Sequence, residues 1–240
     1  MDLPSRHLAD IQAPVQALDG WDGSIAYLDR DGVLNVGRED YVKNVTEVAM
    51  LEGAGNAVAA LRDAGYRIVI VTNQSPVNRG VFSHEELAEI NDAVLSGLLK
   101  ENSEAHVDLV LYSPYAPWDN SPVRKPGPGM LQVGRQLLSN LPLEVKENSN
   151  LLTQQYDEGR SFMAGDREAD MGAAIQHGVR GFRVDASVGI SGIINRLLDD
   201  NDEGDALEIC PSGNPRHSGL DSMIPMNGSM DVRRMISTNY

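Results

Sequence analysis

Residues 27–35 read YLDRDGVLN, and in this stretch a short apolar run leads into two carboxylates that are one residue apart. Side chains alternate between the two faces of a β-strand, so a strand that continues past Leu28 would project Asp29 and Asp31 to the same side. Two like charges held close together need a cation or a shared proton. The stretch therefore predicts a buried strand that ends at a charged site.

The chain around this stretch alternates short apolar runs with helical patterns. The expected strands are 25–28, 68–71, 107–112, 162–164 and 181–184. The expected helices are 54–64, 83–100, 129–141, 168–177 and 189–198, with Ser83 as an N-terminal cap. This alternation predicts an α/β protein with a doubly wound parallel sheet and helices on both faces. In such sheets ligands bind beyond the carboxyl ends of the strands.

The composition narrows the class of protein further. The 240 residues carry a formal net charge of -15, which argues against a surface for nucleic acid or anionic membranes. The single cysteine, Cys210, excludes an intrachain disulfide and any metal site of several cysteines. The N-terminus does not resemble a signal peptide, and no apolar run approaches the roughly 18 residues of a membrane span. We expect a cytoplasmic protein.

The domain organisation follows from the same patterns. Residues 1–22 are polar and lack periodicity, so we interpret them as an N-terminal arm. We expect one domain over residues 23–198, with a polar surface insertion at 142–160. Residues 199–240 combine an acidic run with Gly, Ser, Asn and Met, which favours a flexible tail.

Polar side chains gather where the expected strands end. They are Asp29 and Asp31 after the first strand, Thr72, Asn73, Gln74 and Ser75 after the second, Arg124 and Lys125 in the link after the third, and Asp166 and Asp170 after the fourth. Carboxylates can bind Mg²⁺ that also contacts a substrate phosphate, and a lysine and a threonine can stabilise phosphoryl oxygens. The set indicates a phosphoryl-transfer site.

Other interpretations stay open for single members of this set. The Asp pair could be a solvated cap, and Thr72 with Asn73 could be turn chemistry. A calcium loop fits poorly, because Val33 and Leu34 stand where its pattern has Asp or Asn and then Gly. Asp170 could cap a helix, support the site indirectly or contact a metal.

Four segments occur in a fixed order: DRDGVLN at 29–35, VTNQS at 71–75, RKPGPGM at 124–130 and GDREAD at 165–170. They resemble the signature segments of the haloacid dehalogenase (HAD) superfamily of phosphatases. The run NQSPVNRG at 73–80, together with RKPGPGM, resembles the D,D-heptose 1,7-bisphosphate phosphatase and histidinol-phosphatase branch. The similarity covers about residues 24–198 and implies a HAD-like Rossmannoid fold. The interval 35–54 is too short for a large cap domain.

The resemblance implies roles for the residues at the strand ends. Asp29 would attack phosphorus and form an aspartyl-phosphate, and Asp31 would protonate the leaving oxygen and then activate water. Mg²⁺ would be held by the Asp29 side chain, the Asp31 main-chain carbonyl and Asp166. Thr72 and Lys125 would grip the phosphoryl group.

The resemblance also implies residues that contact the rest of the substrate. Arg124 could bind a second phosphate through its guanidinium. The segment after the first strand resembles a flap over the substrate. The expected contacts are Arg38, Glu39 and Tyr41 from this flap, with Asn73, Gln74, Ser75 and Arg124. We assign no role to Arg167.

The loop YSPYAPWDNSPVRKP at 112–126 departs from the branch, many members of which bind zinc here. The residues at the positions of the zinc ligands are Ser113, Tyr115, Ser121 and Val123. None offers a thiolate or an imidazole, so no structural zinc is expected. We expect Pro114, Pro117 and Pro122 to stiffen the loop and Trp118 to pack it down.

The leading hypothesis is a Mg²⁺-dependent phosphatase whose small-molecule substrate is a sugar phosphate, D-glycero-D-manno-heptose 1,7-bisphosphate, cleaved through an aspartyl-phosphate intermediate. The alternatives are a histidinol-phosphate phosphatase, a polynucleotide 3′-phosphatase, which the missing basic groove disfavours, and a non-enzymatic binding or regulatory protein that keeps the fold. We expect no nucleic-acid or membrane partner, and a monomer or a weak homo-oligomer.

Overall fold

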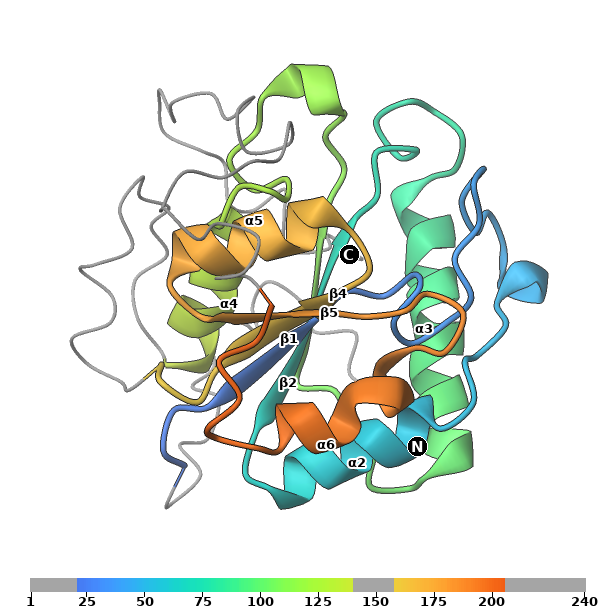
Figure 1. Cartoon of the computed structure of the whole chain (residues 1–240). Coiled ribbons are helices and arrows are strands. Elements are labelled where there is room, and N and C mark those ends of the chain that lie inside the picture. The colour runs from blue at the N-terminus through green and yellow to red at the C-terminus, as the bar shows by residue number, and fades with distance from the viewer. Residues whose placement is uncertain (1–20, 140–157, 206–240) are drawn as a thin grey trace.

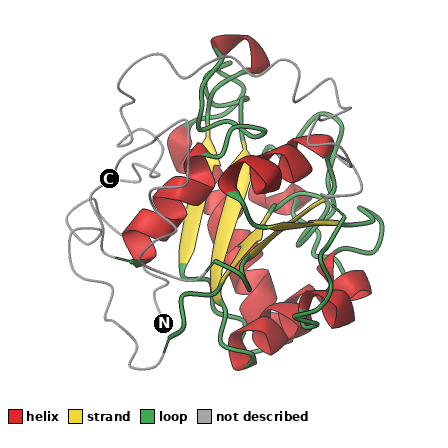
Figure 2. Ribbon diagram, turned by 60° about the vertical axis from the view of Figure 1, so that its left-hand side comes forward, coloured by secondary structure: helices red, strands yellow, loops and turns green. Residues whose placement is uncertain are grey.

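The structure, a computed structural model, describes residues 21–139 and 158–205. Five parallel strands form a sheet in the order β3-β2-β1-β4-β5 (Figures 1 and 2). The strands are β1 (Ile25–Leu28), β2 (Arg67–Asn73), β3 (Leu109–Ser113), β4 (Phe162–Gly165) and β5 (Arg180–Arg183). The predicted parallel α/β architecture is confirmed.

Helices cover both faces of this sheet. They are α2 (Ala54–Asp63), α3 (His84–Glu101), α4 (Gly129–Leu138), α5 (Glu168–His177) and α6 (Ile194–Leu197), with 3-10 turns η1 (Val45–Glu47), η2 (Pro117–Asp119) and η4 (Ile190–Ile193). Figure 1 shows α4 and α5 on one face and α2 and α6 on the other, where α3 also packs. Between β1 and α2 the described chain contains η1 and no separate cap domain.

The strands are apolar because both of their faces are buried. In β1, Ala26 and Leu28 belong to the core cluster shared with α2 and α3, while Ile25 and Tyr27 belong to the cluster shared with α4 and α5. Parallel strands covered on both sides therefore read as continuous apolar runs. This is why the expected strands and the observed strands coincide closely.

The order of the strands fixes where a ligand can bind. The chain builds outward from β1 to β2 and β3, then returns to place β4 and β5 on the other side of β1. A doubly wound sheet leaves a crevice at the carboxyl ends of the strands where the direction reverses. Here the reversal lies at β1, directly after which Asp29 and Asp31 follow.

Two predicted helices differ from the structure. The helix expected over 189–198 is divided into η4 and α6, and a glycine, Gly192, lies inside η4, where it disfavours a regular helix. The helix α4 ends at Leu138, and residues 140 and 141 of the expected helix lie outside the described residues. No helix in the described ranges is long and apolar enough to cross a lipid bilayer.

The expected outer segments lie partly outside the described residues. These are residues 1–20 of the arm, 142–157 of the insertion and 206–240 of the tail. Residues 199–205, which we expected in the tail, are instead attached to the domain: Asp202 and Asp205 both pair with Arg196, and Gly204 bridges to β5. Their acidity serves ion pairing here, a role that composition does not distinguish from a solvated run.

Glu158, expected in the surface insertion, is buried and belongs to a charged cluster. Its carboxylate accepts hydrogen bonds from Arg135 on α4 at 2.6 Å and lies 3.3 Å from Nε2 of His177 on α5. Burial works against ionisation of Glu158, but the hydrogen bonds and charges of His177 and Arg135 outweigh it and lower its pKa from 4.5 to about 2. The cluster ties both helices to the chain entering β4.

This lowered pKa predicts how stability depends on pH. A carboxyl group whose pKa falls on folding stabilises the protein above its unfolded pKa, and this contribution is lost as the pH drops from 4.5 toward 2. We expect Glu158→Gln to lower the free energy of unfolding at pH 7 by up to about 3 kcal/mol. The difference from the parent should shrink below pH 4.5. Urea unfolding at pH 7 and at acid pH measures this, with exposed Glu89→Gln as control; a difference that is independent of pH would contradict the prediction.

Candidate active site

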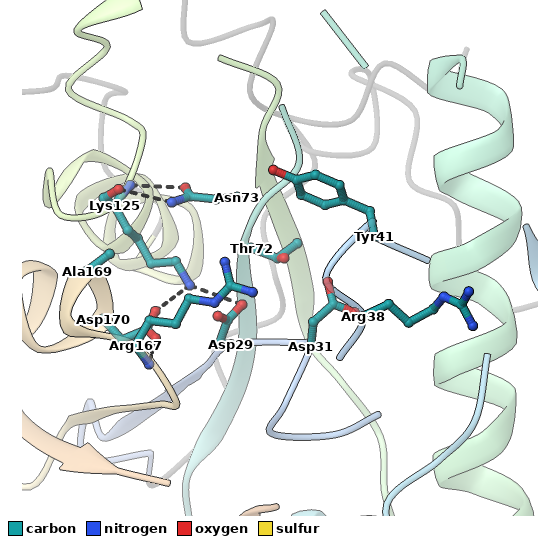
Figure 3. A pocket seen from close by; sticks show the side chains of 10 residues that line it. All are labelled: Asp29, Asp31, Arg38, Tyr41, Thr72, Asn73, Lys125, Arg167, Ala169 and Asp170. Atoms are coloured by element: carbon teal, nitrogen blue, oxygen red, sulfur yellow. Dashed lines mark hydrogen bonds and ion pairs between the residues drawn. The ribbon is translucent and has the colours of Figure 1, made fainter. Parts of the chain in front are cut away.

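A cleft opens at the carboxyl ends of β1 and β2, beside the loop before α4 and the start of α5 (Figure 3). The residues lining it are Asp29, Asp31, Arg38, Tyr41, Thr72, Asn73, Lys125, Arg167, Ala169 and Asp170. The structure thus brings together all four predicted catalytic side chains. Asp166 lies next to Asp29, whereas Gln74, Ser75 and Arg124 are not part of this lining.

Asp29 is placed by the sheet itself. It follows the last residue of β1, and its backbone N–H donates to the Ala164 carbonyl of β4 at 2.9 Å. The chain then turns sharply at Gly32, which has a φ of +80°. A Cβ at Gly32 would lie 2.7 Å from Oδ2 of Asp166, so only glycine allows the two loops to approach this closely.

Lys125 lies at the centre of the site, where Figure 3 shows its ion pairs. Its Nζ is 3.1 Å from Asp29 Oδ1 and 2.6 Å from Asp170 Oδ1, and it donates to the Val71 carbonyl at 2.7 Å. The Lys125 backbone is held by Asn73, whose amide group donates to the Lys125 carbonyl and accepts from its N–H. Asn73 therefore attaches the loop after β3 to the end of β2.

Asp170 combines two of the roles that the sequence left open. One oxygen accepts from the backbone N–H of Arg167 and caps α5, while the other pairs with Lys125. The side chain is buried, and Gly165 makes room for it, since a Cβ there would lie 2.1 Å from the Asp170 carboxyl carbon. Asp170 thus positions the lysine.

The electrostatics of the cluster favour binding a cation. Burial raises the pKa of Asp29 to about 6; Lys125 lowers it, while Asp170 and Asp31 raise it further. Burial and the nearby Asp29 also raise the pKa of Asp166. The carboxylates of Asp170 and Asp29 outweigh burial and raise the pKa of Lys125, which keeps its positive charge.

A divalent cation fits the same group of residues. Carboxylate oxygens of Asp29, Asp166 and Asp170 lie within 4.8 Å of one another. Oδ1 of Asp166 is buried and has no hydrogen-bond partner among the described residues. A buried polar atom without a partner is expensive, and hard cations such as Mg²⁺ prefer oxygen ligands. The donor set therefore suits Mg²⁺.

Asp31 is held by a network of donors. Arg30 contacts both of its oxygens, Asn35 donates to Oδ1 at 2.8 Å and Gln74 donates to Oδ2 at 2.9 Å. Burial opposes the charge of Asp31, but the Arg30 guanidinium and these hydrogen bonds outweigh burial, so the pKa of Asp31 lies below its usual value. The orientation of this carboxylate is thus determined from inside the protein.

Two expected substrate contacts occupy different positions from those predicted. Gln74 is fully buried and bridges Asp31 to the Thr72 hydroxyl, at 2.9 Å from each, so it faces the interior. Ser75 is also buried, and its hydroxyl lies 3.3 Å from the Tyr41 hydroxyl. Sequence reasoning missed Arg30 as a member of the site, although it stands between the two motif aspartates.

The flap after β1 reaches the cleft through Tyr41. This residue has a φ of 67°, which is rare for a bulky side chain and occurs where surrounding contacts enforce it. Arg38 also lines the cleft, but its guanidinium extends away from Asp29 and Lys125 in Figure 3 and pairs with Asp40 at 3.3 Å. Glu39 is exposed and does not line the cleft.

The loop before α4 is stabilised by hydrogen bonds. Arg124 donates to the Tyr115 carbonyl at 2.8 Å, and the Asp119 carboxylate accepts from the Ala116 N–H at 2.7 Å. Burial lowers the pKa of Arg124. The expected packing of Trp118 is wrong: this residue is 70% exposed, because the short turn η2 directs it outward.

The charge balance around Lys125 yields a prediction for stability. Lys125→Met leaves the carboxylates of Asp29 and Asp170 close together without their buried cation, so we expect the free energy of unfolding to fall by about 3–5 kcal/mol. Adding Asp170→Asn should recover part of this loss, because one negative charge is removed. Urea unfolding of both single variants and the double variant measures the coupling; additive losses would contradict it.

The sequence is similar to those of known phosphatases. No family model matches the chain. A curated D-glycero-beta-D-manno-heptose-1,7-bisphosphate 7-phosphatase from Neisseria meningitidis is 39% identical over 110 residues, or 45% of this chain and 58% of the relative. The protein of the same name from Mesorhizobium japonicum is 34% identical over 192 residues, or 75% of this chain and 79% of the relative. The match thus spans somewhat more than half of the Neisseria relative and most of the Mesorhizobium one.

A solved structure shows the same fold. The D,D-heptose 1,7-bisphosphate phosphatase from B. bronchiseptica, complexed with magnesium and phosphate, is 29% identical and superimposes with a TM-score of 0.54. The superposition covers 72% of this chain and 85% of that structure.

Proposed function

Because the chain belongs to the family of D-glycero-D-manno-heptose-1,7-bisphosphate 7-phosphatases, we propose that it is a Mg²⁺-dependent phosphatase that removes one phosphate from a heptose 1,7-bisphosphate. The convergence of Asp29, Asp166 and Lys125 at one end of the sheet carries this proposal. The relative solved with magnesium and phosphate supports the choice of metal and of substrate class.

Asp29 is the proposed nucleophile. Its carboxylate attacks phosphorus, the bond to the leaving oxygen breaks, and an aspartyl-phosphate forms, which divides one difficult hydrolysis into two easier steps. The Lys125 ammonium lies 3.1 Å from Asp29 and offsets charge on the phosphoryl oxygens, and the Thr72 hydroxyl lines the same cleft. Water then attacks the aspartyl-phosphate and releases phosphate, which restores Asp29.

Asp31 transfers the protons in both steps. It donates a proton to the leaving oxygen in the first step, and as a carboxylate it takes a proton from the attacking water in the second. The donors around Asp31 favour the carboxylate form needed for the second step. The negative charge of an arriving phosphate favours protonation, which prepares the first step.

The side chains of Asp29 and Asp166, with the main-chain carbonyl of Asp31, would hold Mg²⁺. When bound, the ion supplies positive charge for the phosphoryl oxygens and keeps Asp29 ionised. Asp170 pairs with Lys125 and caps α5, so its proposed role is to hold Lys125 in position.

We assign the selection of the substrate to residues at the rim of the cleft. We assign the sugar contacts to Tyr41 and Arg38, which line the cleft from the flap. Arg124 keeps its loop in place through Tyr115 and offers the remaining donors of its guanidinium to the second phosphate. Asn73 aligns the loop that carries Arg124 and Lys125.

The nucleophile assignment predicts the effect of Asp29→Asn. An amide is a poor nucleophile, so kcat should fall by about 10³-fold or more. The thermal unfolding temperature should stay near that of the parent, because Lys125 keeps its ion pair with Asp170 at 2.6 Å. Asp63→Asn, at the exposed last residue of α2 and outside the cleft, is the matched control and should keep parental activity. Residual activity near the parental level in purified Asp29→Asn would refute the assignment.

Metal and substrate dependence can be measured together. Phosphate release from both anomers of D-glycero-D-manno-heptose 1,7-bisphosphate and from histidinol phosphate should be followed with Mg²⁺ and with EDTA. We expect release that depends on the metal, and a higher kcat/KM for one heptose anomer than for histidinol phosphate. A higher kcat/KM for histidinol phosphate would make that compound the proposed substrate instead. Phosphate release that EDTA does not diminish would refute the proposed dependence on Mg²⁺.

A further inference from the structure

Arg30, between the two motif aspartates, is completely buried and does not line the cleft. Its guanidinium uses several of its donors. Nη2 donates to Asp31 Oδ2 at 2.9 Å, Nε is 3.3 Å from Asp31 Oδ1, and Nη1 donates to Oδ1 of Asn91 at 2.8 Å. The planar guanidinium therefore connects the carboxylate of Asp31 to a side chain of α3.

Asn91 is a polar residue on the buried face of α3. Its neighbours along this face are Leu87, Ile90, Val94 and Leu98, all buried in the core. A polar side chain at such a position is unfavourable unless it forms hydrogen bonds. Oδ1 of Asn91 accepts such a bond from Nη1 of Arg30. An apolar residue would suit the packing of this helix face better, so packing alone does not explain the amide at position 91.

The helix that carries Asn91 is a firm support. It has 18 residues, and at its start Ser83 and Glu86 form a reciprocal capping box. At its other end Glu101 accepts hydrogen bonds from the N–H groups of Gly53 and Gly55 at the start of α2. The hydrogen bond that Arg30 donates to Asn91 on this helix therefore holds the guanidinium in a fixed plane.

We propose that Asn91 is a positioning residue for proton transfer: by holding Nη1 of Arg30, it fixes the direction in which Asp31 presents its carboxylate to the leaving oxygen. This inference rests on the proposed function, in which Asp31 is the proton donor. Asn35 and Gln74 each donate to one oxygen of Asp31, but the fork of Arg30 contacts both and sets the plane of the group. Without the acceptor on Asn91, the fork can rotate and the plane is lost.

Leaving-group dependence separates positioning from mere stability. For a two-step phosphatase, kcat/KM reports the steps up to departure of the leaving group. Phenolate leaves poorly without a proton, whereas p-nitrophenolate leaves readily. The test is therefore the ratio of kcat/KM for phenyl phosphate to kcat/KM for p-nitrophenyl phosphate, measured with Mg²⁺ in the parent and in the variants. A loss of packing lowers both constants equally, while a misplaced proton donor lowers the ratio.

In Asn91→Leu, of similar shape but without an acceptor, the ratio should fall by about tenfold, part of the roughly 10²–10⁴-fold that a general acid supplies. Arg30→Lys should lower the ratio as well, because an ammonium cannot span Asp31 and Asn91. Asn91→Asp retains an acceptor and should restore the parental ratio. Val94→Ala, one turn along the same helix, should lower the thermal unfolding temperature and leave the ratio unchanged.

A parental ratio in Asn91→Leu, whatever its unfolding temperature, would overturn the inference and leave Asn91 a structural residue. A parent that hydrolyses the phenyl esters but not heptose 1,7-bisphosphate would overturn the proposed substrate alone, and the ratio would still decide the role of Asn91. A parent that hydrolyses neither the phenyl esters nor heptose 1,7-bisphosphate would overturn both.

Discussion

The ion pairs of Lys125 hold this site together. The ends of β1 and β4 and the first turn of α5 bring Asp29, Asp166 and Asp170 close together. Their like charges repel strongly because little water screens them. The lysine lies between two of them, at 3.1 Å from Asp29 and 2.6 Å from Asp170. Its position in turn requires the loop before α4 to stay beside β2, which Asn73 ensures through two backbone hydrogen bonds. The charge balance of the aspartates and the position of the loop before α4 therefore both depend on Lys125, the first through its ammonium group and the second through its backbone.

Much of this arrangement could be predicted from the sequence, because the physics of a parallel sheet is periodic. The strand at 25–28 and the helix at 168–177 have their predicted bounds, and most of the polar residues after the strands lie together at the cleft. Side-chain directions within turns follow no such period. Gln74 therefore faces the interior rather than the substrate, and Arg30 turns into the core. Trp118 illustrates the same limit, since its exposure depends on a turn, η2, that hydrophobicity does not report.

The interior behind the cleft is unusually polar for a core. Arg30, Asn35, Gln74 and Asn91 are all buried and all belong to hydrogen bonds that end at Asp31 or at its partner. These hydrogen bonds restrict the orientation of the side chains that form them, while Oδ1 of Asn35 and Oε1 of Gln74 have no hydrogen-bond partner among the described residues. On the opposite face, Glu158 and Arg135 play a comparable part for α4 and α5 without contacting the cleft. The first cluster orients a side chain of the cleft, whereas the second stabilises the packing of α4 and α5.

The flap is attached in a different manner. Its charged residues, Arg38, Asp40 and Lys43, form ion pairs that are largely exposed to solvent. Dissolved ions screen such pairs over about 10 Å at 0.1 M ionic strength, whereas buried pairs are screened far less. Raising the ionic strength should therefore weaken the ion pairs at the entrance to the cleft, while the pairs of Lys125 persist. The strength of the ion pairs at the rim of the cleft thus depends on the salt concentration, whereas that of the ion pairs at the reaction centre depends on it far less.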